Sequence, residues 1–146
     1  MGLTVSGLDE LIGDLDELAG LPDQVLEDVL NAEADVILPA QREEIARQWT
    51  GKYSIGISAK SVKKGKVKKG QDGYSLAIYP QGTRKRGKKD PKTIRNAEIA
   101  FINEYGAPKR GIAARPAIGT ATAKKEQEAV EAGEKVYHAY LDSKGL

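Results

Sequence analysis

The hydrophobic positions of the first fifty residues repeat at helical spacing. Between residues 8 and 19, apolar side chains recur every three or four positions with acidic side chains between them. This spacing predicts a helix with one apolar face. The apolar seam of a second predicted helix, over residues 22–48, consists of Val25, Val29, Ala32 and Val36. Pro39 lacks a backbone donor, so we expect this second helix to kink or split near Asp35.

After Gly51 the spacing of apolar positions changes to two. Apolar and polar residues alternate over 53–60 and again over 74–80, which predicts two antiparallel strands. The connection, residues 61–73, holds five lysines and is too long and too charged for a tight turn. We expect it to form a projecting, mobile hairpin tip. The next loop, between Pro80 and Pro91, has no apolar residue and is expected to be solvated or bound to a partner.

The last third of the chain has helical patterns. Residues 94–102 are mostly apolar and lead to Gly106, which suits a C-terminal helix cap, although a strand remains an alternative for this stretch. An Ala-rich helix is predicted from Pro116 to about Leu141. The element order predicts an α+β fold: a small antiparallel sheet with a long basic hairpin, covered on one face by two N-terminal helices, plus the C-terminal Ala-rich helix.

Charge is arranged in blocks within what we interpret as a single domain, 1–146. Residues 1–50 carry 12 acids and 2 bases, and residues 51–116 carry 17 bases and 4 acids. The domain divides into an acidic helical part (1–50), a basic hairpin and loop (51–92) and a second helical part (93–146). Opposite potentials on opposite faces would suit a polyanion-facing surface or head-to-tail contact between identical subunits.

Composition excludes several classes of chemistry. The chain has no Cys and a single His, His138, so disulfides, thiolate zinc sites and cysteine nucleophiles are absent and a catalytic triad is disfavoured. Leu, Ile, Val and Phe together number 32 of 146 residues, which predicts a thin core. There is no long apolar run, and the N-terminal segment is acidic, so we expect a soluble cytosolic protein. The expectation is a non-enzymatic protein with no catalytic residue, metal or cofactor.

One segment approaches a nucleotide-binding motif. Residues 82–89 nearly match the phosphate-binding pattern G-x-x-x-x-G-K-[ST]. Lys89 stands where a hydroxyl must reach magnesium, and Pro91 prevents a helix from following at once. Nucleotide binding is therefore disfavoured.

The candidate residues for a subunit interface or a ring lumen lie in two basic loops. They comprise Lys63, Lys64, Lys66, Lys68, Lys69, Arg84, Lys85, Arg86, Lys88 and Lys89. Such side chains can bind phosphates in a salt-sensitive way, but no aromatic residue lies between them to stack on bases. A small cytosolic nucleic-acid-binding protein that uses these loops remains the alternative to a protein-contacting surface.

Three sequence elements together resemble a known family. The first is Arg47-x-x-Thr50-Gly51-x-Tyr53-Ser54-Ile55, the second runs from Ala100 through Glu104-Tyr105-Gly106, and the third is Ala114-Arg115-Pro116 before the Ala-rich helix. In order and spacing they resemble elements of the tail-component (neck, or tail-completion) family of long-tailed bacteriophages. The similarity extends from the first predicted helix to the last.

The resemblance implies a structural virion protein that joins the head connector to the tail. It implies a homo-oligomeric ring, with a hexamer favoured and a dodecamer as the alternative. The neighbours would be head-closure or connector proteins and tail-terminator or tail-tube proteins, with genomic DNA passing nearby and no membrane. The protein would be assembled in the bacterial cytoplasm and reside in the neck or tail of the virion. The structural motif residues are Thr50, Gly51, Glu104, Gly106, Arg115 and Pro116, and we expect Glu104 and Arg115 to make buried contacts that fix the local turn.

Overall fold

The computed structural model describes residues 22–50, 56–71, 73–86 and 92–145. The predicted helix over 8–19, together with Gly51, Lys88 and Lys89, lies outside the described residues. The elements are α2 (Asp23–Gln48), α3 (Ile57–Ser61), β1 (Val62–Lys64), β2 (Lys68–Gly70), β3 (Gly73–Ser75), β4 (Ile78–Pro80), β5 (Thr83–Lys85), β6 (Thr93–Arg95), α4 (Asn96–Tyr105), the 3-10 turn η1 (Pro108–Arg110) and α5 (Ala117–Ser143). The chain is thus a mixed helix and strand protein with small antiparallel pairs, as expected for the α+β class.

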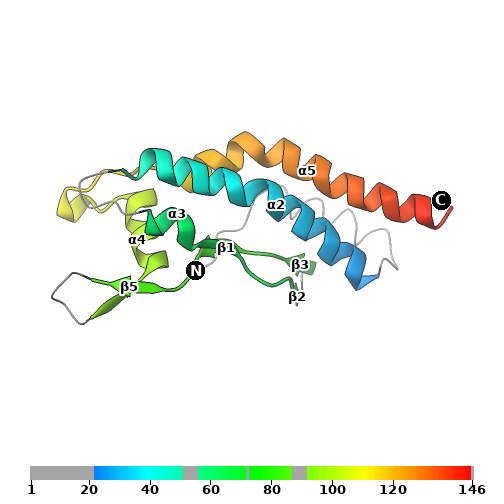
Figure 1. Cartoon of the computed structure of the whole chain (residues 1–146), viewed down its shortest axis with the longest axis horizontal. Coiled ribbons are helices and arrows are strands. Elements are labelled where there is room, and N and C mark those ends of the chain that lie inside the picture. Colours follow the sequence, from blue (N-terminus) through cyan, green and yellow to red (C-terminus); the bar gives the residue numbers. More distant parts are fainter. Residues whose placement is uncertain (1–21, 51–55, 72, 87–91, 146) are drawn as a thin grey trace.

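Two long antiparallel helices, α2 and α5, run side by side along the molecule (Figure 1). Gln41 on α2 donates to the hydroxyl of Thr122 on α5 at 3.2 Å. The buried residues of α5 are Ala117, Ile118, Ala121, Ala129 and Gly133. All of them except Ile118 have small side chains. Small side chains let the two backbones approach closely, so the Ala-rich composition of α5 suits a helix that packs on another helix.

Pro39 does not split α2, so the predicted split near Asp35 is wrong. The helix is continuous from Asp23 to Gln48 with Pro39 inside it. Pro39 and Asp35 are both exposed, so the Asp35 carbonyl that loses its helical donor lies on the solvent side of the helix. Water can satisfy that carbonyl, which removes the main reason for the helix to end there.

The strands form three separate two-stranded antiparallel ladders instead of one sheet. β1 pairs with β4 and β2 pairs with β3, so these four strands make one long hairpin. Val62 pairs with Pro80 near the base of the hairpin, and Lys68 pairs with Ser75 near its tip. Between the two ladders, the first arm has one residue more than the second arm. This is the geometry of a β-bulge, which divides the hairpin into two ladders. β5 and β6 form a second, separate hairpin.

The predicted strand over 53–60 is wrong in its described part. Residues 57–61 form the single helical turn α3, preceded by Gly56 at φ 75°. A positive φ at Gly56 interrupts an extended chain, and glycine accepts it without steric cost. The apparent alternation across Gly56 therefore did not indicate a strand, and the hairpin begins only at Val62.

The described part of the segment 61–73 is largely strand, so the prediction that all of it forms a hairpin tip is wrong. Lys63 and Lys64 belong to β1, and Lys68 and Lys69 belong to β2. Val62 is fully buried at the start of β1. Lysines can occupy strands next to an apolar layer because their long stems reach past it and leave the ammonium groups in water.

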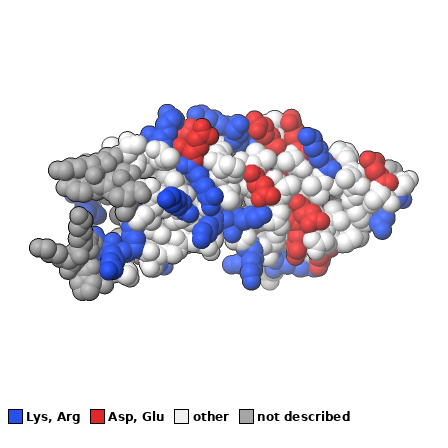
Figure 2. All heavy atoms as spheres, viewed as in Figure 1, with Lys and Arg blue, Asp and Glu red and all other residues white. Residues whose placement is uncertain are grey.

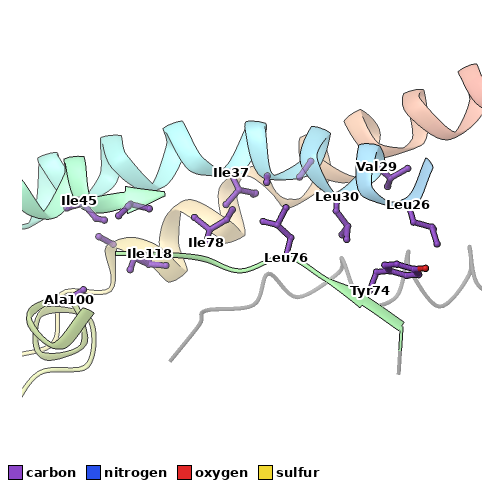
Figure 3. Close-up of a cluster of buried hydrophobic side chains, with 14 of the residues drawn as sticks. Leu26, Val29, Leu30, Ile37, Ile45, Tyr74, Leu76, Ile78, Ala100 and Ile118 are labelled. Atoms are coloured by element: carbon purple, nitrogen blue, oxygen red, sulfur yellow. The ribbon is translucent and has the colours of Figure 1, made fainter. Parts of the chain in front are cut away.

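The core is a thin apolar layer between α2, α5 and the long hairpin (Figure 3). At one end Leu26 and Leu30 of α2 face Tyr74 and Leu76 of the hairpin. At the other end the layer consists of Ile45, Ala100 and Ile118, contributed by α2, α4 and α5 (Figure 3). The helix covering the hairpin is therefore α2, and its main partner is α5 at the C-terminal end of the chain.

Candidate functional site

Arg115 connects the end of α2 to the end of α4. Its guanidinium donates to the backbone carbonyls of Gln48 at 3.3 Å and Thr50 at 3.2 Å, and to the Asn103 side-chain oxygen at 2.8 Å. Its backbone N–H donates to the Asn103 carbonyl at 2.7 Å. The indole N–H of Trp49 donates to the Arg115 carbonyl at 2.7 Å. Arg115 thus joins segments that are far apart in sequence.

Glu104 caps the start of α5. Its carboxylate oxygens accept hydrogen bonds from the backbone N–H groups of Ile118 at 2.9 Å and Gly119 at 2.8 Å. The Glu104 side chain comes from α4 and is buried. The first N–H groups of a helix lack intrahelical partners, and a carboxylate there both satisfies them and complements the helix dipole.

Gly106 ends α4, as predicted. Its φ is 75°, and its backbone N–H donates to the Ile102 carbonyl at 2.7 Å. The chain then makes a short loop that includes η1 and closes through paired backbone bonds between Ala107 and Ile112. This loop leads directly to Ala114 and the Arg115 contacts.

We name the cluster formed by Thr50, Glu104, Gly106, Arg115 and Pro116 the junction. It contains described residues from each of the three sequence elements that resembled the phage family, and the first element takes part through the backbone carbonyl of Thr50. Its charged groups bind backbone groups of the same chain, so the hydrogen bonds of the junction serve the architecture. Within the described ranges, no group of three or more His, Cys, Asp or Glu residues is arranged to hold a metal ion.

Replacing Glu104 by Gln should destabilise the protein by about 1–2 kcal/mol, because an amide has only one oxygen to accept from the two N–H groups and carries no charge to complement the helix dipole. Urea denaturation of both proteins at pH 7 measures the change. As a control, Glu98→Gln alters an exposed residue of the same helix and should cost less than about 0.5 kcal/mol. Equal losses in the two variants would contradict the capping role.

The lysines of the long hairpin divide into two groups. Lys63, Lys66 and Lys68 are exposed. Lys64 instead forms an ion pair with Asp35 of α2 at 2.9 Å, and Lys69 lies 3.9 Å from Asp23. Figure 2 shows acidic side chains directly beside Lys and Arg on this face of the molecule. Part of the charge separation seen in the sequence is therefore neutralised between α2 and the hairpin of the same chain.

Arg84 also makes internal contacts, contrary to the expectation of a wholly solvated or partner-bound loop. Its guanidinium donates to the Asn96 side-chain oxygen at 2.7 Å and to the Ser58 hydroxyl at 2.8 Å. The Asn96 amide donates in turn to the Gln81 carbonyl at 2.8 Å. Burial lowers the pKa of Arg84. The neighbouring Lys85 and Arg86 are exposed.

Two glutamates of α2 have special environments that the sequence analysis did not single out. Hydrogen bonds from Lys124 at 2.7 Å and Gln48 at 3.0 Å, with one from Arg47, lower the pKa of Glu44 to about 2. Glu33 is fully buried against Gly133 of α5, and neither of its carboxyl oxygens has a hydrogen-bond partner among the described residues. Its position four residues after Val29, on the apolar face of α2, was the signal for its burial.

An apolar patch lies on α4. Phe101 and Tyr105 have relative exposures of 45% and 55%, and their ring centroids are 4.9 Å apart. They border a depression that is also lined by Pro80, Ala97, Ala100, Glu104 and Ile118. Large exposed aromatic residues that adjoin an apolar depression are typical of contact surfaces.

Comparisons of the chain with models of protein families, with curated proteins and with solved structures found no match. None of the described helices is both long enough and apolar enough to cross a membrane.

Proposed function

We propose that this chain is a structural protein of a tailed-phage virion, a neck or tail-completion component that joins the head connector to the tail as part of an oligomeric ring. The supporting observation is the junction. Described residues of three sequence elements that resemble the phage family in order and spacing meet there: Arg115 donates to the Thr50 carbonyl, and Glu104 accepts from the start of α5. This arrangement suits a structural subunit, because the polar groups of the junction position helix ends of the same chain.

The proposed neighbours are further copies of the chain, in a hexameric or dodecameric ring, and the head-closure or connector and tail-terminator or tail-tube proteins on either side. Lys63, Lys66 and Lys68 are exposed on one hairpin and would contact acidic surfaces of those neighbours. Lys64, Lys69 and Arg84 already have partners within the chain, which reduces the charge left for gripping DNA.

The experiment removes the gene from the phage genome and supplies the protein from a plasmid. We expect the deletion to leave DNA-filled heads and free tails, counted by electron microscopy, and the wild-type protein to restore complete particles. A triple variant, Lys63→Ser, Lys66→Ser and Lys68→Ser, should join heads to tails poorly. A control with the same change of charge, Lys60→Ser, Lys135→Ser and Lys144→Ser, alters exposed lysines elsewhere and should join them normally.

Complete particles in the absence of the protein would contradict the proposed function. Normal joining by the hairpin variant, together with altered DNA retention, would contradict the protein-contacting role of the lysines and favour loops that face DNA. The nucleic-acid-binding alternative predicts a purified monomer or dimer whose affinity for DNA falls steeply with salt.

A further inference from the structure

The patch formed by Phe101 and Tyr105 lies in a part of the sequence that is rich in positive charge. Residues 83–86 and 92–111, which flank the patch in sequence, hold seven Lys or Arg and two Glu. Of these glutamates, Glu104 is engaged in capping α5 and Glu98 pairs with Arg95 at 2.8 Å. A binding partner that combines an apolar stripe with acidic flanks would therefore complement this surface.

The chain itself contains such a segment. The sequence predicts a helix over residues 8–19 whose apolar stripe is formed by Leu8, Leu11, Ile12, Leu15 and Leu18. Residues 1–21 contain five acids and no base. These residues lie outside the described structure, and the chain enters it at Pro22.

The position of Pro22 decides which copy can supply this segment. Pro22 precedes α2, whereas the patch is at the other end of α2, as Figure 1 and the positions of Leu26 and Ala100 in Figure 3 show. With 26 residues, α2 is about 39 Å long at 1.5 Å per residue. A helix over 8–19 is about 18 Å long, and two linking residues add about 7 Å. The segment therefore cannot reach the patch of its own chain while it is helical.

We propose that the patch formed by Phe101 and Tyr105 binds the apolar face of residues 8–19 from a second copy of the chain. The two surfaces are different parts of the molecule, so the contact is head to tail and repeats from copy to copy, closing into a ring where the rotation allows. The proposal does not depend on a role in a phage, because the same contact can form in any setting where the protein reaches sufficient concentration.

Two full-length variants test the proposal by complementation. The patch variant carries Phe101→Ser and Tyr105→Ser, and the stripe variant carries Leu11→Ser and Leu15→Ser. By native mass spectrometry and sedimentation velocity, the wild type should form oligomers, and each variant alone should associate about tenfold or more weakly. An equimolar mixture should form a one-to-one dimer, since one variant keeps an intact stripe and the other an intact patch.

A control variant, Phe101→Leu with Tyr105→Phe, keeps the patch apolar and should associate as the wild type does. Thermal melts followed by circular dichroism establish that every variant is folded. A mixture that stays monomeric, or variants that associate as strongly as the wild type, would overturn the proposal. A monomeric wild type would overturn it as well, and would leave the patch to a different protein.

Discussion

The wild-type protein should lose stability as the pH rises from about 4.5 to about 8. Replacing Glu33 by Gln should remove most of this pH dependence. Burial raises the pKa of Glu33 from 4.5 to about 8, and the nearby negative charge of Glu134 adds to the effect. The physical cause is visible in the contacts, since the carboxyl group is enclosed between α2 and α5 without a hydrogen-bond donor among the described residues.

The direction of the pH effect follows from proton binding. Between the unfolded and folded pKa values of Glu33, the folded protein holds a proton that the unfolded chain has released. The contribution of Glu33 to the free energy of unfolding therefore falls as pH rises, with a limiting slope of about 1.4 kcal/mol per pH unit. Below about pH 4.5 both states are protonated at this residue, and above about pH 8 both are ionised. Glu33 then contributes no further slope.

Urea denaturation at intervals from pH 4.5 to pH 8.5 measures this slope for the wild type and for Glu33→Gln. The slope is the decisive quantity, because the buried amide of the variant lacks partners too and lowers its stability at every pH. Glu134→Gln is the matched control: it removes the neighbouring charge and should reduce the slope only slightly. Parallel curves for the wild type and Glu33→Gln would contradict the assignment of a neutral, buried Glu33.

Glu44, on the same helix, has the opposite effect. Its pKa is lowered to about 2 by its hydrogen bonds, so its stabilising contribution is present above about pH 4.5 and is lost as pH falls toward 2. Together these two groups contribute most to stability near pH 4.5, where the contribution of Glu44 is present and that of Glu33 has not yet fallen. This pH is more acidic than the range in which most proteins are most stable.

Local signals in the sequence predicted the helix ends well. Gly106 ends α4, because glycine accepts a positive φ, and Pro116 precedes α5, because proline lacks an N–H donor. Both effects are local, so the sequence alone indicates them. The pairing of α2 with α5 had no such signal. The buried face of α5 is largely Ala and Gly, which does not distinguish a helix that packs on another helix from one that covers a sheet.

The hairpin was misplaced for a related reason. Glycine fits a polar position in an alternating pattern, so the run through Gly56 resembled a strand although its backbone is left-handed there. Lys63, Lys64, Lys68 and Lys69 gave the strands of the hairpin the composition of a solvated loop. Which lysines find acidic partners depends on the path of the chain in three dimensions, and residue composition does not contain that information.

At the junction the sequence indicated which residues matter but not what they contact. Glu104 and Arg115 belong to the motifs that resemble the phage family, and both were expected to make contacts that fix the local turn. Their partners are the N–H groups at the start of α5 and the carbonyls at the end of α2. Backbone groups leave no trace in the sequence, so contacts of this kind become visible only in the structure.

The junction should tolerate no side chain at Gly106. A Cβ atom there would lie 2.8 Å from both the Ala114 nitrogen and the Ile112 oxygen, and these backbone atoms belong to the segment that leads to Arg115. The φ of 75° is also unfavourable for any residue with a Cβ. Gly106→Ala should therefore lower the free energy of unfolding by about 3 kcal/mol or more, measured by urea denaturation at pH 7.

Gly111→Ala is the control for a positive φ without a close contact. Gly111 has a φ of 70°, but a Cβ atom at this position would have no neighbour within 4 Å. Its replacement should cost only the left-handed backbone strain, about 1 kcal/mol. The excess loss in Gly106→Ala then combines the displacement of residues 112–114 with the greater backbone strain at Gly106, whose φ of 75° and ψ of 178° lie in a region that essentially only glycine occupies. Equal losses at the two glycines would show that the backbone of 112–114 moves aside freely, and that the junction is not the rigid connection between α2, α4 and α5 described here.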